Sequence, residues 1–215
     1  MFKFHDGQLG LAHNGNLTNA VSLRRELEKN GAIFSSTSDS EILAHLIRRS
    51  HNPSFMGKVK EALNTVKGGF AYLLMIEDKL IAALDPNGFR PLSIGKMANG
   101  AIVVSSETCA FEVVGAEWIR DVNPGEVVII DDNGITYDNY TTDTQLAVCS
   151  MEYIYFARPD SNIRGSMSIQ LVNVWVLNWH VSSNMKQILS LVCLIHHLAQ
   201  PWDLRKNQAC QMKWA

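Results

Sequence analysis

The chain has 215 residues, 47% of them hydrophobic and 19% charged, as in an ordinary water-soluble globular protein. Its net charge of -2, and the polar residues that interrupt the apolar stretch 171–198, give no reason to expect nucleic acid or a membrane as partner. The four cysteines have no CxxC spacing, which excludes a self-contained zinc site or a disulfide framework and favours a reducing cytoplasm.

The first predicted strand runs over residues 2–12 and leads into a polar turn at Asn14–Gly15. Asn-Gly is a common turn dipeptide, because glycine adopts backbone conformations that other residues resist. The same pair also suits acyl transfer, since an amide side chain and a glycine N–H can both donate to one oxyanion. The motif alone leaves both interpretations open.

Three helices are predicted next, over residues 19–30, from Ser38 onward, and over residues 54–67. Ser38 and Glu41 have the spacing of a capping box in front of a run of apolar residues. Asp39 then falls in the first helical turn. There it either complements the helix dipole or offers a carboxylate to a ligand.

From Phe70 the pattern changes to short apolar runs that predict strands of a sheet buried on both faces. Asn133–Gly134 predicts a hairpin turn, and helices followed by strands indicate an α+β layered domain. A loop follows at 85–88, and for Arg90 after it we favour a structural role that ties down the loop over a catalytic one. The predicted strands cover residues 70–76, 79–84, 92–96, 101–105 and 126–131.

Five motifs, taken together in order and spacing, resemble the amidophosphoribosyltransferase family, and the likeness covers residues 1 to 165. The first two are shared with other class II glutamine amidotransferases, such as glucosamine-6-phosphate synthase, whereas the later three are particular to this family. The motifs are His13–Asn16, Thr37–Glu41, Asp85–Leu92, Ser106–Phe111 and Cys149–Ser161.

The resemblance implies a four-layer αββα sandwich of the N-terminal-nucleophile type. Residues 1–147 would be a partial class II glutamine amidotransferase domain, and residues 148–165 the start of a phosphoribosyltransferase domain. The implied reaction converts glutamine and 5-phosphoribosyl diphosphate into 5-phosphoribosylamine, glutamate and diphosphate, the first committed step of purine biosynthesis. The family also implies Mg²⁺, a cytoplasmic location and a homo-oligomer.

The family's roles carry over to Asn14 (side-chain amide) and Gly15 (backbone N–H) as the oxyanion hole, and to Asp39 as the group that binds the α-amino group of glutamine. A carboxylate suits that task because its bond to an ammonium is charge-assisted. Cys149 corresponds to a ligand of the 4Fe-4S cluster in one subgroup. The alternative for Cys149 is a small buried apolar residue, and both stay open.

The nucleophile of the family is an N-terminal cysteine whose α-amine acts as the base, and Met1–Phe4 does not supply it. The sequence therefore predicts a chain that holds no cofactor and is inactive alone. Two rivals remain: the glutaminase domain of a sugar-phosphate amidotransferase, and a non-catalytic remnant that binds glutamine. An assay for ammonia release from glutamine separates an enzyme from a remnant.

Residues 166–215 differ sharply in composition from the rest: they contain no Gly, Glu, Phe or Tyr but four of the five tryptophans. Met and Trp each have one codon, so reading one frame over forces Gly at Trp175–Val176 and Glu at Met185–Lys186. The whole hidden frame can be read as the start of the family's transferase domain. We therefore expect a frameshift after Gly165 and a disordered tail whose histidines and cysteines form no metal site.

Overall fold

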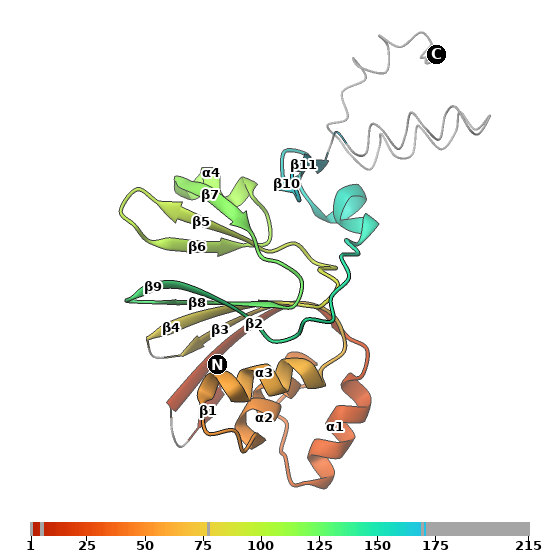
Figure 1. Cartoon of the computed structure of the whole chain (residues 1–215). Coiled ribbons are helices and arrows are strands. Elements are labelled where there is room, and N and C mark those ends of the chain that lie inside the picture. The colour runs from red at the N-terminus through yellow and green to blue at the C-terminus, as the bar shows by residue number, and fades with distance from the viewer. Residues whose placement is uncertain (1, 5–6, 77, 169, 171–215) are drawn as a thin grey trace, which may run out of the picture. The chain divides into compact units, whose positions relative to one another are not determined.

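The computed structural model describes residues 2–4, 7–76, 78–168 and 170 (Figure 1). The chain divides into two compact units. The first comprises residues 1–106 and 110–149, and the second comprises Glu107–Cys109 and the chain from Ser150 onward. The expectation of a disordered tail concerns mainly residues 171–215, which lie outside the described residues.

The helices and strands are labelled in Figure 1. The helices are α1 (Ala20–Lys29), α2 (Ser40–Arg49), α3 (Phe55–Thr65), α4 (Cys109–Val114) and a short π-helix (Glu152–Phe156). The strands are β1 (Phe2–Phe4), β2 (Gly7–Leu17), β3 (Gly68–Ile76), β4 (Lys79–Leu84), β5 (Ser93–Met97), β6 (Ile102–Ser105), β7 (Ala116–Asp121), β8 (Glu126–Asp131), β9 (Gly134–Asn139), β10 (Asn162–Ile163) and β11 (Ser166–Met167).

The first unit is built on a six-stranded antiparallel sheet with the order β1-β2-β3-β4-β8-β9. Its central strands are buried on both faces, as the apolar runs predicted. Because side chains alternate along a strand, Phe70, Tyr72 and Leu74 of β3 pack against α1–α3, while Ala71 faces the other way. The helix-facing core therefore receives the aromatic side chains of β3, whereas the opposite core is aliphatic, with Ala82, Leu84 and Val128 among its residues.

A second, three-stranded sheet with the order β6-β5-β7 lies over that opposite face (Figure 1). Ile94 and Val122 contribute to the core between the two sheets. On its other side the neighbouring Gly95 leaves room for Phe111 of α4, since a Cβ there would lie 2.9 Å from the Phe111 ring. The order helices, sheet, sheet, helix confirms the predicted α+β class and the αββα sandwich.

The predicted helices at 19–30 and 54–67 and the predicted strands from Phe70 onward are confirmed to within a few residues, whereas the single strand predicted over residues 2–12 is in fact two paired strands, β1 and β2. Helix α3 begins after Ser54, whose hydroxyl accepts a hydrogen bond from the Gly57 N–H at 2.9 Å. The Asn133–Gly134 hairpin joins β8 to β9 as predicted, with Gly134 at φ +118. Helix α4 and strand β7 were not predicted.

Two further local predictions were wrong. Asn14–Gly15 is not a turn, because β2 continues through it to Leu17 in register with β3. Ser38 does not begin α2 in a capping box. The Glu41 carboxylate instead accepts hydrogen bonds from the backbone N–H groups of Ser35 and Ser36, at 2.8 and 2.9 Å. These bonds fix the loop in front of the helix.

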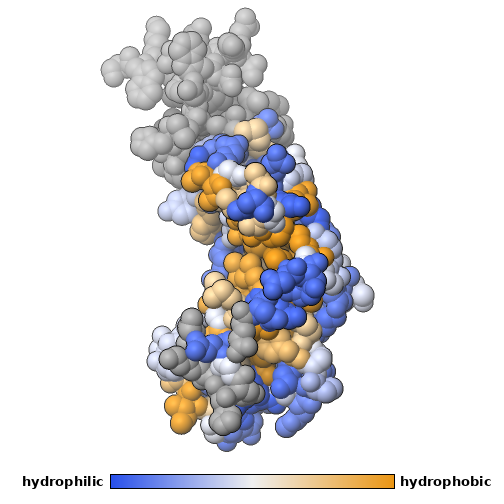
Figure 2. Space-filling model, turned by 90° about the vertical axis from the view of Figure 1, so that its left-hand side faces the viewer, coloured by the Kyte–Doolittle hydropathy of each residue, from blue (hydrophilic) through white to orange (hydrophobic). Residues whose placement is uncertain are grey.

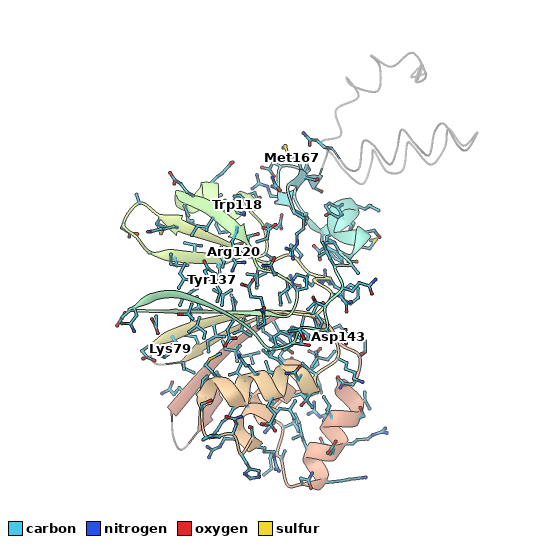
Figure 3. All side chains as sticks on the ribbon, in the orientation of Figure 1. Lys79, Trp118, Arg120, Tyr137, Asp143 and Met167 are labelled. Carbon is cyan, nitrogen blue, oxygen red and sulfur yellow. The ribbon has the colours of Figure 1, made fainter. Side chains whose placement is uncertain are left out.

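A polar clamp ties the two sheets together, formed by Arg120 of β7, Glu126 of β8 and Tyr137 of β9. Two nitrogens of Arg120 donate to the two Glu126 oxygens at 2.9 and 2.5 Å. The guanidinium carbon also lies 4.0 Å from the centre of the Tyr137 ring, and both side chains point toward each other in Figure 3. The clamp thus links strands of both sheets through one cation.

Apolar surface is concentrated on the face of the first unit where strands of both sheets end, which is the face shown in Figure 2. The large apolar side chains that are exposed in this unit include Met75, Trp118 and Tyr137. No helix of the described ranges is long and apolar enough to cross a membrane.

In the second unit, Glu107 organises the loop before β10. Its Oε2 accepts from the Arg158 N–H at 2.7 Å and from the Ser161 hydroxyl at 2.8 Å. Beyond the loop, β10 and β11 form a two-residue hairpin. Ser168 is fully buried and donates to the Tyr153 carbonyl at 2.8 Å, so packing extends a few residues past the boundary predicted for the tail.

Candidate active site

Gly15 lies where β2 and β3 approach each other most closely. Its φ is +147, and a Cβ at this position would lie 2.1 Å from the Gly69 carbonyl oxygen and 2.8 Å from the Phe70 Cα. Glycine is the residue type that meets both demands, a positive φ and an absent side chain. The close approach, rather than a turn, is the reason for glycine here.

The Gly15 N–H faces away from β3. The Phe70 N–H donates to the Asp85 carboxylate at 3.1 Å, and the Phe70 carbonyl accepts from the Asp85 N–H at 2.9 Å. Both polar backbone groups of Phe70 are thus used on the β4 side, so the Gly15–Phe70 pair exchanges no hydrogen bonds. The Gly15 N–H points to the other edge of β2, where β1 pairs only with residues 7–9.

Asn14 presents its amide on the exposed surface next to Gly15. Its Nδ2 donates to the Ser106 hydroxyl at 3.5 Å, which is at the outer limit of a hydrogen bond. This weak contact leaves the amide able to donate to a ligand. Asn14 and Gly15 therefore offer a side-chain donor and a backbone donor on one short segment of β2.

Asp39 directs its carboxylate toward β2 and makes no side-chain cap on its own helix α2. Oδ2 accepts from the Leu17 N–H at 2.9 Å, and Oδ1 lies 3.5 Å from His13 Nδ1. Capping of α2 is thus not its role. The side chain remains 24% exposed, so the carboxylate is held by the strand that carries Asn14 and is still accessible to a ligand.

His13 also lies at this site, although no role was predicted for it beyond its place in the motif His13–Asn16. Its side chain is 2% exposed and stacks on Tyr72, with ring centres 4.2 Å apart. Burial lowers the pKa of His13 below its usual value, and the charge of Arg90 acts in the same direction, while Asp39 opposes them. No local pattern reveals this residue, because its partner Ser40 lies 27 residues away.

Asp85 holds the loop that follows β4 against the same part of β3. Its carboxylate is fully buried and accepts the backbone N–H groups of Phe70, Asn87 and Phe89 at 2.8–3.3 Å. Burial raises the Asp85 pKa, although these hydrogen bonds act to lower it. The loop carries Arg90, whose structural role remains a prediction.

Cys149 donates its N–H to the Phe89 carbonyl at 3.3 Å and is partly buried. Within the described residues no three His, Cys, Asp or Glu side chains are grouped as a metal site requires. Cys149 alone therefore does not form a site for an iron–sulfur cluster, and its role as one ligand remains a prediction.

A cavity of about 400 Å³ lies elsewhere in the first unit, at the C-terminal end of α3. Asn64, Lys67, Asn87 and Asp143 contribute to its walls, and Asp143 is labelled in Figure 3. None of the predicted site residues lines it. The candidate active site is instead the exposed segment of β2 around Asn14–Gly15 with Asp39 beside it.

Comparisons with known proteins indicate the family to which this domain belongs. A family model described as a glutamine amidotransferase domain matches residues 1–113. Amidophosphoribosyltransferase from Staphylococcus aureus is 53% identical over 165 residues, which are 77% of this chain and 33% of that protein. The Bacillus subtilis amidophosphoribosyltransferase is 53% identical over 161 residues, or 75% of this chain and 34% of that protein. The chain thus spans about a third of the length of these curated relatives.

Two solved structures resemble this chain closely. One is glutamine phosphoribosylpyrophosphate amidotransferase from B. subtilis in complex with ADP and GMP, with a TM-score of 0.82 and 46% identity, covering 86% of this chain and 41% of that one. The other, described as the allosteric regulatory enzyme of purine biosynthesis, has a TM-score of 0.81 and 47% identity, and the match covers 86% of this chain and 39% of that one.

Proposed function

The chain belongs to the glutamine amidotransferase domain family, and from this premise we propose that it contributes the glutamine-binding part of an amidophosphoribosyltransferase. Such an enzyme releases ammonia from glutamine and joins it to 5-phosphoribosyl diphosphate, giving 5-phosphoribosylamine and diphosphate. The observation that carries the proposal is the Gly15 N–H on the open side of β2, next to the exposed Asn14 amide.

In this proposal Asn14 and Gly15 stabilise the intermediate of acyl transfer. A nucleophile adds to the carbon of the glutamine side-chain amide, and the π electrons of the carbonyl move onto its oxygen. Asn14 Nδ2–H and the Gly15 N–H donate to that oxyanion. The proton that the nucleophile loses passes to the amide nitrogen, which leaves as ammonia when the carbonyl re-forms, and water then hydrolyses the acyl group from the nucleophile to give glutamate.

Asp39 supplies the second half of the recognition. Its carboxylate is already oriented by the Leu17 N–H and has exposed surface left for a ligand. A charge-assisted hydrogen bond to the α-ammonium of glutamine would distinguish the free amino acid from a glutamine residue within a peptide.

The remaining properties of the proposed enzyme rest on the family alone. They are 5-phosphoribosyl diphosphate as acceptor, Mg²⁺ as cofactor, a homo-oligomeric assembly and a cytoplasmic location. The described residues contain no group of side chains that could hold a metal ion.

The test uses a full-length amidophosphoribosyltransferase that carries residues 1–165 of this chain. We expect Asn14→Ala to lower glutamine-dependent turnover by roughly 100- to 1000-fold, the typical effect of losing one oxyanion donor. Synthesis from free ammonia should be unchanged, because it bypasses the oxyanion. The matched control is Asn16→Ala, an exposed asparagine of the same strand. Equal losses with glutamine and ammonia would remove Asn14 from this role.

Asp39→Asn in the same enzyme should mainly raise the KM for glutamine. The lost charge-assisted bond is present in both the ground state and the transition state, so kcat should change much less than KM. A fall in kcat at unchanged KM would contradict the binding role of Asp39.

We also propose that the tail is a frameshifted start of the transferase domain. Its support is the change of composition after Gly165 and the forced codons described above. Nucleotide sequencing across Gly165, followed by translation of the other frame, tests the idea. Identity to the S. aureus relative near the 53% of the first 165 residues would support it, and an unrelated translation would overturn it.

A further inference from the structure

His13 is placed to act on Asp39 rather than on a ligand directly. It precedes Asn14 on β2, and its ring lies against the start of α2. Nδ1 is 3.1 Å from the Ser40 hydroxyl oxygen and 3.5 Å from Asp39 Oδ1. The buried ring, stacked on Tyr72, has little freedom to turn away.

The surroundings of the ring select one tautomer. If Nδ1 carried a lone pair, that lone pair would face the Asp39 carboxylate, which is electrostatically unfavourable. With the proton on Nδ1, the N–H can donate to Asp39 and to Ser40 at once. Nε2 is then an acceptor, and it has no hydrogen-bond partner among the described residues, like the neighbouring Tyr72 hydroxyl.

We propose that His13 is a positioning residue of the glutamine site: its neutral imidazole, protonated on Nδ1, holds the Asp39 carboxylate in place to receive an ammonium. This inference deepens the proposed function and rests on it for the identity of the ligand. Two groups of β2, the Leu17 N–H and the His13 ring, then hold one oxygen of Asp39 each. The carboxylate is thereby fixed relative to the oxyanion donors on the same strand.

The charges around the ring favour the neutral form. Asp39 at the start of α2 acts to raise the His13 pKa, whereas burial and Arg90 on the loop after β4 lower it, and the net direction is downward. Tyr72 on β3 stays neutral because burial raises its pKa far above its usual value. A second proton on Nε2 would be buried without an acceptor among the described residues.

The first test measures the tautomer in the complete chain by ¹H–¹⁵N NMR of the histidine rings, with the signals of His13 assigned by their loss in His13→Asn. We expect the proton on Nδ1 at pH 7.5 in the wild type. In Asp39→Asn this preference should weaken, since the carboxylate that selects it is gone. A proton on Nε2 in the wild type would overturn the proposal, whatever the ligand of the site is.

The second test compares two substitutions in the full-length enzyme that carries this segment. The side-chain amide of His13→Asn can place an N–H near the position of Nδ1, whereas His13→Phe keeps the aromatic stacking on Tyr72 and loses the donor. We expect His13→Phe to raise the KM for glutamine roughly 10- to 100-fold, and His13→Asn to restore most of that loss. Synthesis from ammonia should be equal in both variants.

A purely packing role predicts the opposite order. His13→Phe would then retain the wild-type KM, and His13→Asn would be the poorer variant in both stability and activity; that outcome overturns the proposal. Absence of glutamine-dependent activity in the wild-type enzyme would instead refute the proposed function. The NMR measurement still decides the interaction of His13 with Asp39 in that case.

Discussion

Replacing Gly15 by alanine tests the close approach of β2 and β3 directly. The added Cβ would lie 2.1 Å from the Gly69 carbonyl oxygen, whereas ordinary contacts begin at 3.4 Å. Either β3 must move by about 1 Å or the pairing of the two strands must open locally. The positive φ adds strain of about 1–3 kcal/mol for a residue with a side chain.

We therefore expect Gly15→Ala to lower the free energy of unfolding of the complete chain by at least about 3 kcal/mol, a large part of the stability of a typical domain. Two glycines separate the contributions. Gly10→Ala lies on the same strand with its nearest contact at 3.4 Å, and Gly100→Ala has φ +89 but nothing within 4 Å. The first control should be neutral or slightly stabilising, and the second should report the strain alone.

Urea unfolding followed by circular dichroism and tryptophan fluorescence measures all three variants. Stability should decrease in the order Gly10→Ala, Gly100→Ala, Gly15→Ala. If Gly15→Ala were as stable as Gly100→Ala, the clash with β3 would be relieved without cost, and the close approach of the strands would not be the reason for glycine at this position.

Three further predictions concern stability. Arg120→Met should destabilise the chain by about 2–3 kcal/mol in urea unfolding, because it leaves the buried Glu126 carboxylate without its cation. Similar losses for Glu126→Gln and for the double variant would indicate that the two residues share one interaction. Additive losses would refute it. Asp85→Asn should cost about 1–3 kcal/mol by the same assay, because an amide NH₂ would face backbone N–H donors that now meet carboxylate oxygens; an unchanged midpoint would contradict this. The lowered pKa of His13 means that the unfolded state binds the proton more readily than the folded state. The contribution of neutral His13 to stability should therefore be complete above about pH 6.5 and decline as the pH falls below it. His13→Phe should flatten that part of the stability–pH curve.

Periodicity predicted the fold well where burial is regular. The apolar runs at 70–76 and 79–84 predicted strands buried on both faces, and the structure confirms them as β3 and β4. Helix α4 was missed because it has only six residues. Strand β7 is as long as β4, but in its sequence Ala-Glu-Trp-Ile-Arg-Asp the apolar and polar residues do not alternate, and both Trp118 and Ile119 are exposed.

The predictions around the site failed where a partner distant in sequence decides the conformation. Asn14–Gly15 has the preference of a turn, but pairing with β3, more than fifty residues later, keeps it in a strand. Glu41 has the spacing of a capping box, yet the free N–H groups of Ser35 and Ser36 bind it more effectively. The contact of His13 with Asp39 has no local signal at all.

The unequal filling of the six-stranded sheet has a consequence for how the chain folds. Tyr72 and Phe70 lie on the face of β3 that meets the helices, whereas the core on the face that meets the second sheet is aliphatic, with Ala71 and Leu73 from the same strand. A hairpin formed one residue out of register would place an aromatic ring in the aliphatic layer between the sheets and force them apart. Misregistered intermediates should therefore be unable to recruit the second sheet. The three-stranded sheet should therefore dock only after the strands of the six-stranded sheet have paired in the native register.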